Sequence, residues 1–296
     1  MHEHYSHRTV VFRSARRGAC ADRALVLQAL GIPFEISTEA GTHSLVVDSA
    51  DQATALEQLD LYERENRGWP PRFMPLVKQS SGSIGALVYC LVLLLFAYLS
   101  GHDTLSANWY LAGKVDVALI RDGEWWRTVT ALTLHGDVAH LVGNMMFGAA
   151  FGLFAAQLLG NGLAWSSILI AGAAGNALNA LFQAPSHTAV GASTAVFAAL
   201  GLLSAYSWRT RHASTHHWAY RWGPIVGGIA LLAYTGTGDE NTDIFAHLTG
   251  FVSGALLGAV YGQLGERVIL SAKGQALMGA GALAALAVTW GLAVTA

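Results

Sequence analysis

The sequence predicts an all-α polytopic membrane helix bundle that is preceded by a small N-terminal α+β domain. Hydrophobic residues make up 53% of the chain and charged residues only 12%, whereas ordinary globular domains contain about 25% charged residues. Apolar runs that approach the roughly 20 residues needed to cross a bilayer recur along the chain. The first of them begins only at Ile84, so the residues before it predict a separate soluble domain.

The membrane part contains seven candidate spans, each a run of mainly apolar residues. These runs are 84–101, 141–160, 164–184, 190–207, 222–236, 244–263 and 276–295. No N-terminal stretch has the basic and then apolar composition of a signal peptide. We therefore expect the N-terminal domain to stay in the cytoplasm.

The N-terminal residues predict the order strand, helix, strand, strand, helix. The strands are expected at 9–12, 34–37 and 44–48 and the helices at 21–31 and 49–66, the second opening with a capping box of Ser49 and Gln52. We expect a cytoplasmic α+β domain at 1–68 and a proline-containing linker at 69–80. This domain shows no nucleotide-binding loop and no nucleophile motif, so a regulatory or docking module is the default interpretation.

Lysine and arginine residues beside the spans predict the orientation of the bundle. With the N-terminus inside, the cytoplasmic flanks contain Arg64, Arg67, Arg72, Lys78, Arg209, Arg211, Arg221, Arg267 and Lys273, and the outer flanks contain Lys114, Arg121 and Arg127. The positive-inside rule favours this arrangement. The second, fourth and sixth spans then all run from the outer face to the inner face.

The overall charge and the cysteines exclude some classes of function. The net charge of −2 points to no nucleic-acid partner. The two cysteines, Cys20 and Cys90, suggest neither a disulfide framework nor a thiolate metal site, since one falls in a polar segment and the other inside an apolar run.

Four polar side chains lie at similar depth near the outer ends of three spans. His140 and Asn144 belong to the start of the second span, Ser193 to the start of the fourth and His247 to the start of the sixth. Polar groups inside a bilayer are costly and usually face a bundle interior or a water-filled cavity. Three helices that enter from one side can therefore direct these side chains toward one point.

These residue types are suited to acyl transfer. A serine hydroxyl is a poor nucleophile until a base takes its proton, and His247 supplies an imidazole, whose ordinary pKa is about 6.5. Asn144, His140 and the Ser193 backbone N–H can donate hydrogen bonds to the oxyanion that forms next. The spacing of Gly250, Gly254 and Gly258 allows close helix approach on the face that carries His247, so we expect Ser193 and His247 to meet.

Four segments resemble motifs of the rhomboid family of intramembrane serine proteases. "GASTAVFAALG" at 191–201 is similar to the GxSx serine motif of the family, and "AHLTGFVSGALLG" at 246–258 to its AHxxGxxxG histidine helix. "HLVGN" at 140–144 is similar to its HxxxN motif, and "EWWRTVTALTLH" at 124–135 to the Trp-Arg segment of its first loop. The resemblance covers roughly residues 84–264.

The resemblance implies a serine endopeptidase that cleaves transmembrane helices near the outer face of the bilayer. It implies a dyad of Ser193 and His247, an oxyanion hole of His140 and Asn144, Phe197 stacked on the catalytic histidine, and helix packing at the site by Gly191, Gly250 and Gly254. Phe197 stands where a tyrosine is common in the family, and Thr194 stands where a glycine is common. Both differences leave rate and selectivity open.

The resemblance also implies an architecture and a cellular setting. A six-helix core is expected at 81–264, so 265–296 would hold a cytoplasmic loop and an additional, seventh transmembrane helix. We expect single-span transmembrane proteins as substrates, no cofactor and no metal. The expected location is the bacterial inner (plasma) membrane.

Other polar residues have simpler interpretations than catalysis. Asp243, one turn before His247, predicts a helix N-cap rather than the third member of a triad. Arg127 is expected to anchor the first loop, and Asn176 and Asn179 to form interhelical hydrogen bonds. Two histidine clusters have metal-like spacing but lack acidic or cysteine partners, and they are His2, His4 and His7, and His212, His216 and His217.

Two other classes of function compete with the protease. A catalytically silent rhomboid-like protein with a binding or trafficking role would usually lack the serine or the histidine, and this chain contains both. A transporter or channel would show internal repeats and charged residues within the spans, and the sequence shows neither.

Overall fold

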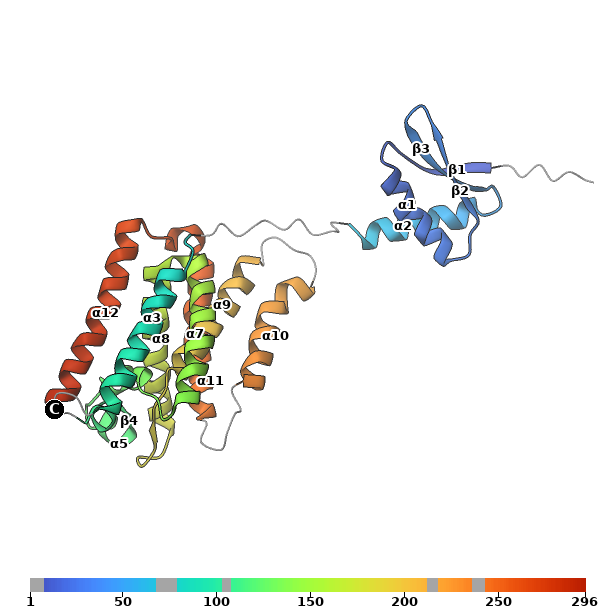
Figure 1. Ribbon diagram of the computed structural model, residues 1–296. Coiled ribbons are helices and arrows are strands. Elements are labelled where there is room, and N and C mark those ends of the chain that lie inside the picture. The colour runs from blue at the N-terminus through green and yellow to red at the C-terminus, as the bar shows by residue number, and fades with distance from the viewer. Residues whose placement is uncertain (1–7, 68–78, 103–107, 212–217, 236–242) are drawn as a thin grey trace, which may run out of the picture. The chain divides into compact units, whose positions relative to one another are not determined.

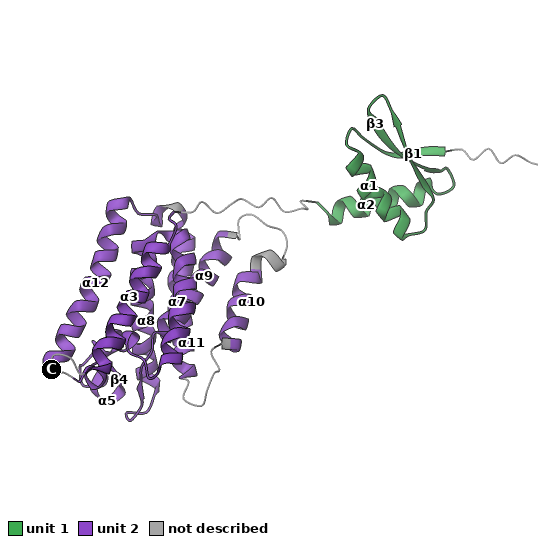
Figure 2. Ribbon diagram, viewed as in Figure 1, with its two compact units in different colours: residues 1–74 green, residues 75–296 purple. Residues whose placement is uncertain are grey.

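The structure is a computed structural model that describes residues 8–67, 79–102, 108–211, 218–235 and 243–296. The chain divides into two compact units, Met1–Met74 and Pro75–Ala296 (Figure 2). Most of the expected linker at 69–80 lies outside the described residues, and so do both histidine clusters.

The first unit is a three-stranded antiparallel sheet with two helices (Figure 1). Its elements in chain order are β1 (Arg8–Ser14), α1 (Arg17–Ala29), β2 (Phe34–Glu39), β3 (Thr42–Asp48) and α2 (Gln52–Glu65). The strand order is β1-β3-β2, with β3 antiparallel to both neighbours. Leu27 of α1, Leu45 of β3 and Leu59 of α2 share one apolar core, so the predicted α+β order is confirmed.

The two helix ends of this unit differ in how well the sequence predicted them. Gly31 adopts a φ of 71° just after α1, and the N–H of Ile32 donates to the Leu27 carbonyl at 2.9 Å, which is the Schellman ending that glycine favours. The predicted capping box of Ser49 and Gln52 at the start of α2 was wrong. The helix begins at Gln52 with Asp51 as N-cap, and the Ser49 hydroxyl pairs with that of Thr9 at 3.0 Å instead.

The second unit is a helical bundle whose long helices match the predicted runs (Figure 1). These helices are α3 (Ser83–Gly101), α7 (Val138–Leu159), α8 (Asn161–Phe182), α9 (Ser193–Arg211), α10 (Trp218–Thr235), α11 (Ile244–Leu264) and α12 (Ala272–Thr295). Among the described residues, α3, α7, α8, α11 and α12 are long and apolar enough to cross a membrane. The chain is therefore an integral membrane protein with a small N-terminal α+β unit.

Helices α9 and α10 are not among these five, although the sequence predicted spans at both places. The C-terminal end of α9 reads "SWRTR", and the part of α10 whose side chains are described, Trp222–Tyr234, is apolar but shorter than a span requires. Almost every residue of α9 from Thr194 to Tyr206 is buried, and α9 contacts α7, α8, α10 and α11. A helix surrounded by other helices does not need a lipid-facing apolar surface, so protein contacts replace lipid around α9.

The segment between α3 and α7 forms a loop of short elements. It contains α4 (Trp109–Gly113), β4 (Val115–Asp116), α5 (Val117–Arg121), α6 (Arg127–Thr130) and the short 3-10 helix η2 (Ala131–Thr133). β4 pairs antiparallel with β5 (Thr188–Ala189), which directly precedes α9. The loop is thereby joined to the chain that leads into α9. Another 3-10 helix, η3 (Gly265–Val268), links α11 to α12.

Candidate active site

Ser193 is the first residue of α9 and is half-buried. Unpaired N–H groups at a helix N-terminus and the positive end of the helix dipole favour negative charge nearby. An oxyanion that forms beside Ser193 would therefore meet a favourable field. The predicted apolar run begins at residue 190, a few residues before Ser193, whereas in the structure the helix itself begins at Ser193.

The backbone before Ser193 is bound to the loop that precedes α7. The N–H of Gly191 donates to the carbonyl of Ala131 at 3.0 Å. The N–H of Ala192 donates to Nε2 of His135 at 3.4 Å. Together with the pairing of β4 and β5, these bonds determine where the chain enters α9.

Gly191 allows His140 to come close to Ser193. Its φ of 138° lies in the region that side chains other than glycine rarely adopt. A Cβ at this position would lie 2.8 Å from Nε2 of His140 and 3.5 Å from Oγ of Ser193. The absence of a side chain at Gly191 thus lets both the His140 imidazole and the Ser193 hydroxyl lie close to the same point.

Helices α9 and α11 run parallel and pack backbone against backbone. A Cβ on Gly250 would overlap the carbonyl of Thr194, and a Cβ on Gly254 would overlap the carbonyl of Ala198. Thr194 also contacts α8, because its Cγ2 lies 2.8 Å from where Gly175 would carry a Cβ. The branched side chain of Thr194 therefore fills the junction of α8, α9 and α11.

This register brings His247 to the level of Ser193. Ser193 lies one residue before Thr194 and His247 three residues before Gly250, so the two residues differ in height by about 3 Å at 1.5 Å per residue. His247 is buried, and its ring centroid lies 4.4 Å from that of Phe197, with the planes tilted by 37°. The ring of Phe197 thus contacts the histidine, in a tilted rather than a parallel arrangement.

Asn144 lies on α7 one turn below His140 and is buried. Its side-chain Nδ2 donates to the backbone carbonyl of His140 at 3.0 Å. The backbone carbonyl of Asn144 accepts a hydrogen bond from the Tyr89 hydroxyl at 2.8 Å. Asn144 is therefore tied to the backbone of His140 and to α3.

His135 is a site residue that the sequence reasoning missed. Its ring centroid lies 5.1 Å from that of His140, in an edge-to-face arrangement. Burial, reinforced by the neighbouring His140, lowers the pKa of His135 to about 4, so the ring is neutral near pH 7 and its Nε2 can accept from the Ala192 N–H. His135 ends the segment "EWWRTVTALTLH", and its position five residues before His140 was the available signal.

Asp243 is an N-cap, as predicted. Its Oδ1 accepts from the Ala246 N–H at 2.9 Å. Its Oδ2 accepts from Nδ2 of Asn179 at 2.6 Å and pairs with Nε2 of His187 at 2.7 Å. The carboxylate thus connects the start of α11 to α8 and to the chain that precedes β5.

Arg127 anchors the loop between α3 and α7, as predicted. It is buried, and its Nε pairs with Glu124 at 2.6 Å. Its Nη1 donates to the carbonyls of Leu111 and Lys114 at 2.9 and 3.1 Å.

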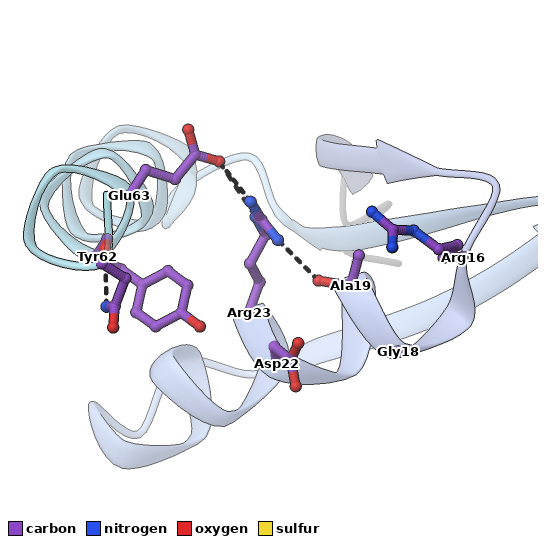
Figure 3. A pocket seen from close by; sticks show the side chains of 8 residues that line it. Arg16, Gly18, Ala19, Asp22, Arg23, Tyr62 and Glu63 are labelled. Carbon is purple, nitrogen blue, oxygen red and sulfur yellow. Dashed lines mark hydrogen bonds and ion pairs between the residues drawn. The ribbon is translucent and has the colours of Figure 1, made fainter. Parts of the chain in front are cut away.

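The first unit contains a polar hollow between α1 and α2 (Figure 3). Arg23 lies in it and donates to Glu63 of α2 at 2.8 Å and to the Ala19 carbonyl at 3.0 Å. Its guanidinium also lies 3.8 Å above the ring of Phe12. Arg23 therefore serves to join the two helices, and the hollow shows no nucleophile paired with a base. Among the described residues of the whole chain, no group of three or more His, Cys, Asp or Glu side chains is arranged to hold a metal ion.

The fold and the site together define a polytopic membrane helix bundle that gathers a serine and histidines beside the N-terminus of α9. Residues 122–264 match the Rhomboid domain family. Rhomboid protease GluP of Bacillus subtilis (strain 168) is 32% identical over 119 residues, which cover 40% of this chain and 23% of that protein. RHOMBOID-like protein 1 of Arabidopsis thaliana is 31% identical over 155 residues, which cover 50% of this chain and 38% of that protein. Rhomboid-like protease 3 of Toxoplasma gondii is 24% identical over 201 residues, which cover 67% and 76% of the two chains.

Over residues 122–264, the second unit belongs to the rhomboid family. The matched part of the chain covers only 23% and 38% of the length of the first two relatives. The matched residues run from the end of α5 to the end of α11, so the first unit and α12 lie outside the family match.

Proposed function

We propose that the protein is an intramembrane serine endopeptidase that uses Ser193 and His247. The observation that carries the proposal is the arrangement at the start of α9. Ser193 opens the helix beside His140, and the register of α9 and α11 places His247 at the same level and against Phe197. A serine, a base and hydrogen-bond donors at one end of a helix are the groups that acyl transfer requires.

The chemistry follows from these groups. Oγ of Ser193 attacks the scissile carbonyl carbon while His247 takes the hydroxyl proton, and the carbonyl oxygen becomes an oxyanion. The backbone N–H at the start of α9, the His140 imidazole and the Asn144 amide are the donors for that oxyanion. His247 then returns the proton to the leaving amine, and water hydrolyses the acyl-enzyme.

The proposed substrates are single-span transmembrane proteins in the same bilayer. Peptide bonds in an intact membrane helix are shielded by their own hydrogen bonds. Substrate helices whose ends unwind easily, through Gly, Ala or Pro, should therefore be cleaved in preference. With the N-terminus in the cytoplasm, as the distribution of Lys and Arg favours, cleavage would occur near the outer face of the bacterial inner membrane.

Labelling of the full-length protein in detergent by a fluorophosphonate tests this proposal. The wild-type protein should be labelled and should cut a model rhomboid substrate, whereas Ser193→Ala and His247→Ala should do neither. Ser204→Ala is the matched control, since Ser204 is a buried serine on the same helix, about three turns further along. Wild-type cleavage by His247→Ala would refute the dyad, and an unlabelled, inactive but folded wild-type protein would favour the catalytically silent alternative.

A further inference from the structure

Helix α12 is bound to the rest of the second unit at both of its ends. Near its start, Gln275 donates from Nε2 to the Leu159 carbonyl at 2.7 Å and accepts the Leu163 N–H at 2.9 Å. It thereby bridges the end of α7 and the first turn of α8. Near its other end, Trp290 enters the loop that precedes α7.

Trp290 is almost completely enclosed by that loop and by α3. Only 4% of its surface is exposed. Its ring stacks on Phe96 of α3 with centroids 4.7 Å apart and lies 5.2 Å from the ring of Trp109 in α4. Its Nε1–H donates to Oγ1 of Thr133 at 3.1 Å, so the contact includes a buried hydrogen bond as well as apolar packing.

The segment held by Trp290 leads directly to the serine. Thr133 is followed by Leu134, which is fully buried in the same apolar cluster as Trp290. His135 comes next and accepts the N–H of Ala192, the residue before Ser193. Val190 packs against that cluster as well, so Trp290 supports both chain segments that meet in front of α9.

We propose that α12 is a positioning element of the candidate active site and that Trp290 is its positioning residue. Trp290 holds the segment from Thr133 to His135, and His135 in turn holds the backbone N–H of Ala192. This inference rests on the proposed function. These contacts, which we call the relay, end at the residue before the nucleophile and do not include α10. Loss of the relay should therefore lower kcat and leave KM for a transmembrane substrate nearly unchanged.

The test separates the hydrogen bond from the apolar packing. Trp290→Phe retains an aromatic ring and removes the N–H, and Thr133→Val retains the shape and removes the hydroxyl. Trp290→Phe should label with fluorophosphonate about tenfold more slowly than wild type, since one lost buried hydrogen bond corresponds to about 1.4 kcal/mol. Thr133→Val should label at least tenfold more slowly, because it also removes the hydrogen bond that the Thr133 hydroxyl donates to the Thr130 carbonyl at 2.8 Å. The double variant should be no slower than Thr133→Val alone, because Trp290→Phe removes only a bond that Thr133→Val has already removed.

Two further variants make the experiment specific to the relay. Thr133→Ser retains the hydroxyl that Thr133→Val removes, and it should label at close to the wild-type rate. Val288→Ala is the control on α12, because Val288 is 60% exposed, and it should label at the wild-type rate. Labelling within twofold of wild type by both Trp290→Phe and Thr133→Val, or additive losses in the double variant, would overturn the proposal.

A second measurement keeps this inference apart from the proposed function. Labelling of wild type against Ser193→Ala decides whether the protein is an active serine enzyme. Hydrogen exchange at the Ala192 amide reports on the relay whether or not the protein is active. That exchange should be faster in Trp290→Phe and in Thr133→Val than in wild type and in Val288→Ala, and unchanged exchange in both variants would refute the positioning role.

Discussion

At the scale of single residues, the backbone conformation of Gly191 directly affects the candidate active site. Its φ of 138° disfavours a side chain, and a Cβ there would lie within 2.8 Å of the His140 ring. The imidazole can move aside only by leaving the position beside Ser193 from which it would donate to an oxyanion. Gly191 therefore matters for the proposed reaction more than for the stability of the bundle.

We predict that Gly191→Ala lowers kcat for substrate cleavage about 100-fold, the usual cost of removing one oxyanion donor. The measurement is kcat in detergent, together with the thermal unfolding midpoint. Gly123→Ala is a matched control, because Gly123 also has a positive φ, 110°, but has no atom within 4 Å of its Cβ position. If Gly191→Ala cleaved as fast as Gly123→Ala, His140 would not be an oxyanion donor.

At the scale of elements, α10 differs from the other helices that contact α9 in having a proline inside it. Leu231 and Leu232 pack against the buried cluster of Phe197, Leu200 and Phe251. Pro224 lies inside α10, where it removes a backbone hydrogen bond. The loop after α10, which the sequence suggests as a lid at 235–241, lies almost wholly outside the described residues. We infer that α10 is the element beside which a transmembrane substrate reaches Ser193.

If α10 controls access, Leu232→Ala should speed cleavage of a transmembrane substrate about twofold or more. The substitution weakens the packing of α10 against the cluster that contains Phe197 and leaves the proposed catalytic residues in place. The measurement compares kcat/KM for that substrate with the rate of labelling by a small fluorophosphonate, which needs no helix to move. Val226→Ala is the control, since Val226 is 53% exposed on the same helix. Slower or unchanged cleavage by Leu232→Ala would count against access beside α10.

At the scale of the whole molecule, the chain consists of two units with separate cores. The core of the first unit is built from α1, β3 and α2, and the residues proposed for catalysis all belong to the second unit. The family match also begins after the first unit, at residue 122. We infer that 1–68 is a separate domain, 69–80 a linker, 81–264 the protease core and 265–296 an added segment with α12.

A protein truncated to begin at Pro75 should therefore keep its activity. We expect labelling and cleavage of a detergent-solubilised substrate within about twofold of the full chain, because no proposed catalytic or positioning residue is removed. Size-exclusion chromatography and helical circular dichroism would establish that the truncated protein is folded. A folded but inactive truncated protein would show that the first unit takes part in catalysis.

The sequence predicted the long helices well because their signal is local. Apolar runs of about 20 residues mark α3, α7, α8, α11 and α12 wherever the neighbouring helices lie. The same holds for Asp243, since an N-cap depends on residues only three positions away. The capping box at Ser49 failed because the Ser49 hydroxyl pairs with that of Thr9 on β1, a residue 40 positions away in the sequence.

The sequence by itself determined the family and the residue types of the candidate site, since Ser193, His247, His140 and Asn144 lie in motifs whose order and spacing can be read directly. Only the tertiary structure decided how these residues are supported. The bond from Ala192 to His135 joins residues 57 positions apart, and the bond from Trp290 to Thr133 joins residues 157 positions apart. No local pattern encodes such pairs, because they depend on how distant helices and loops pack together once each has formed.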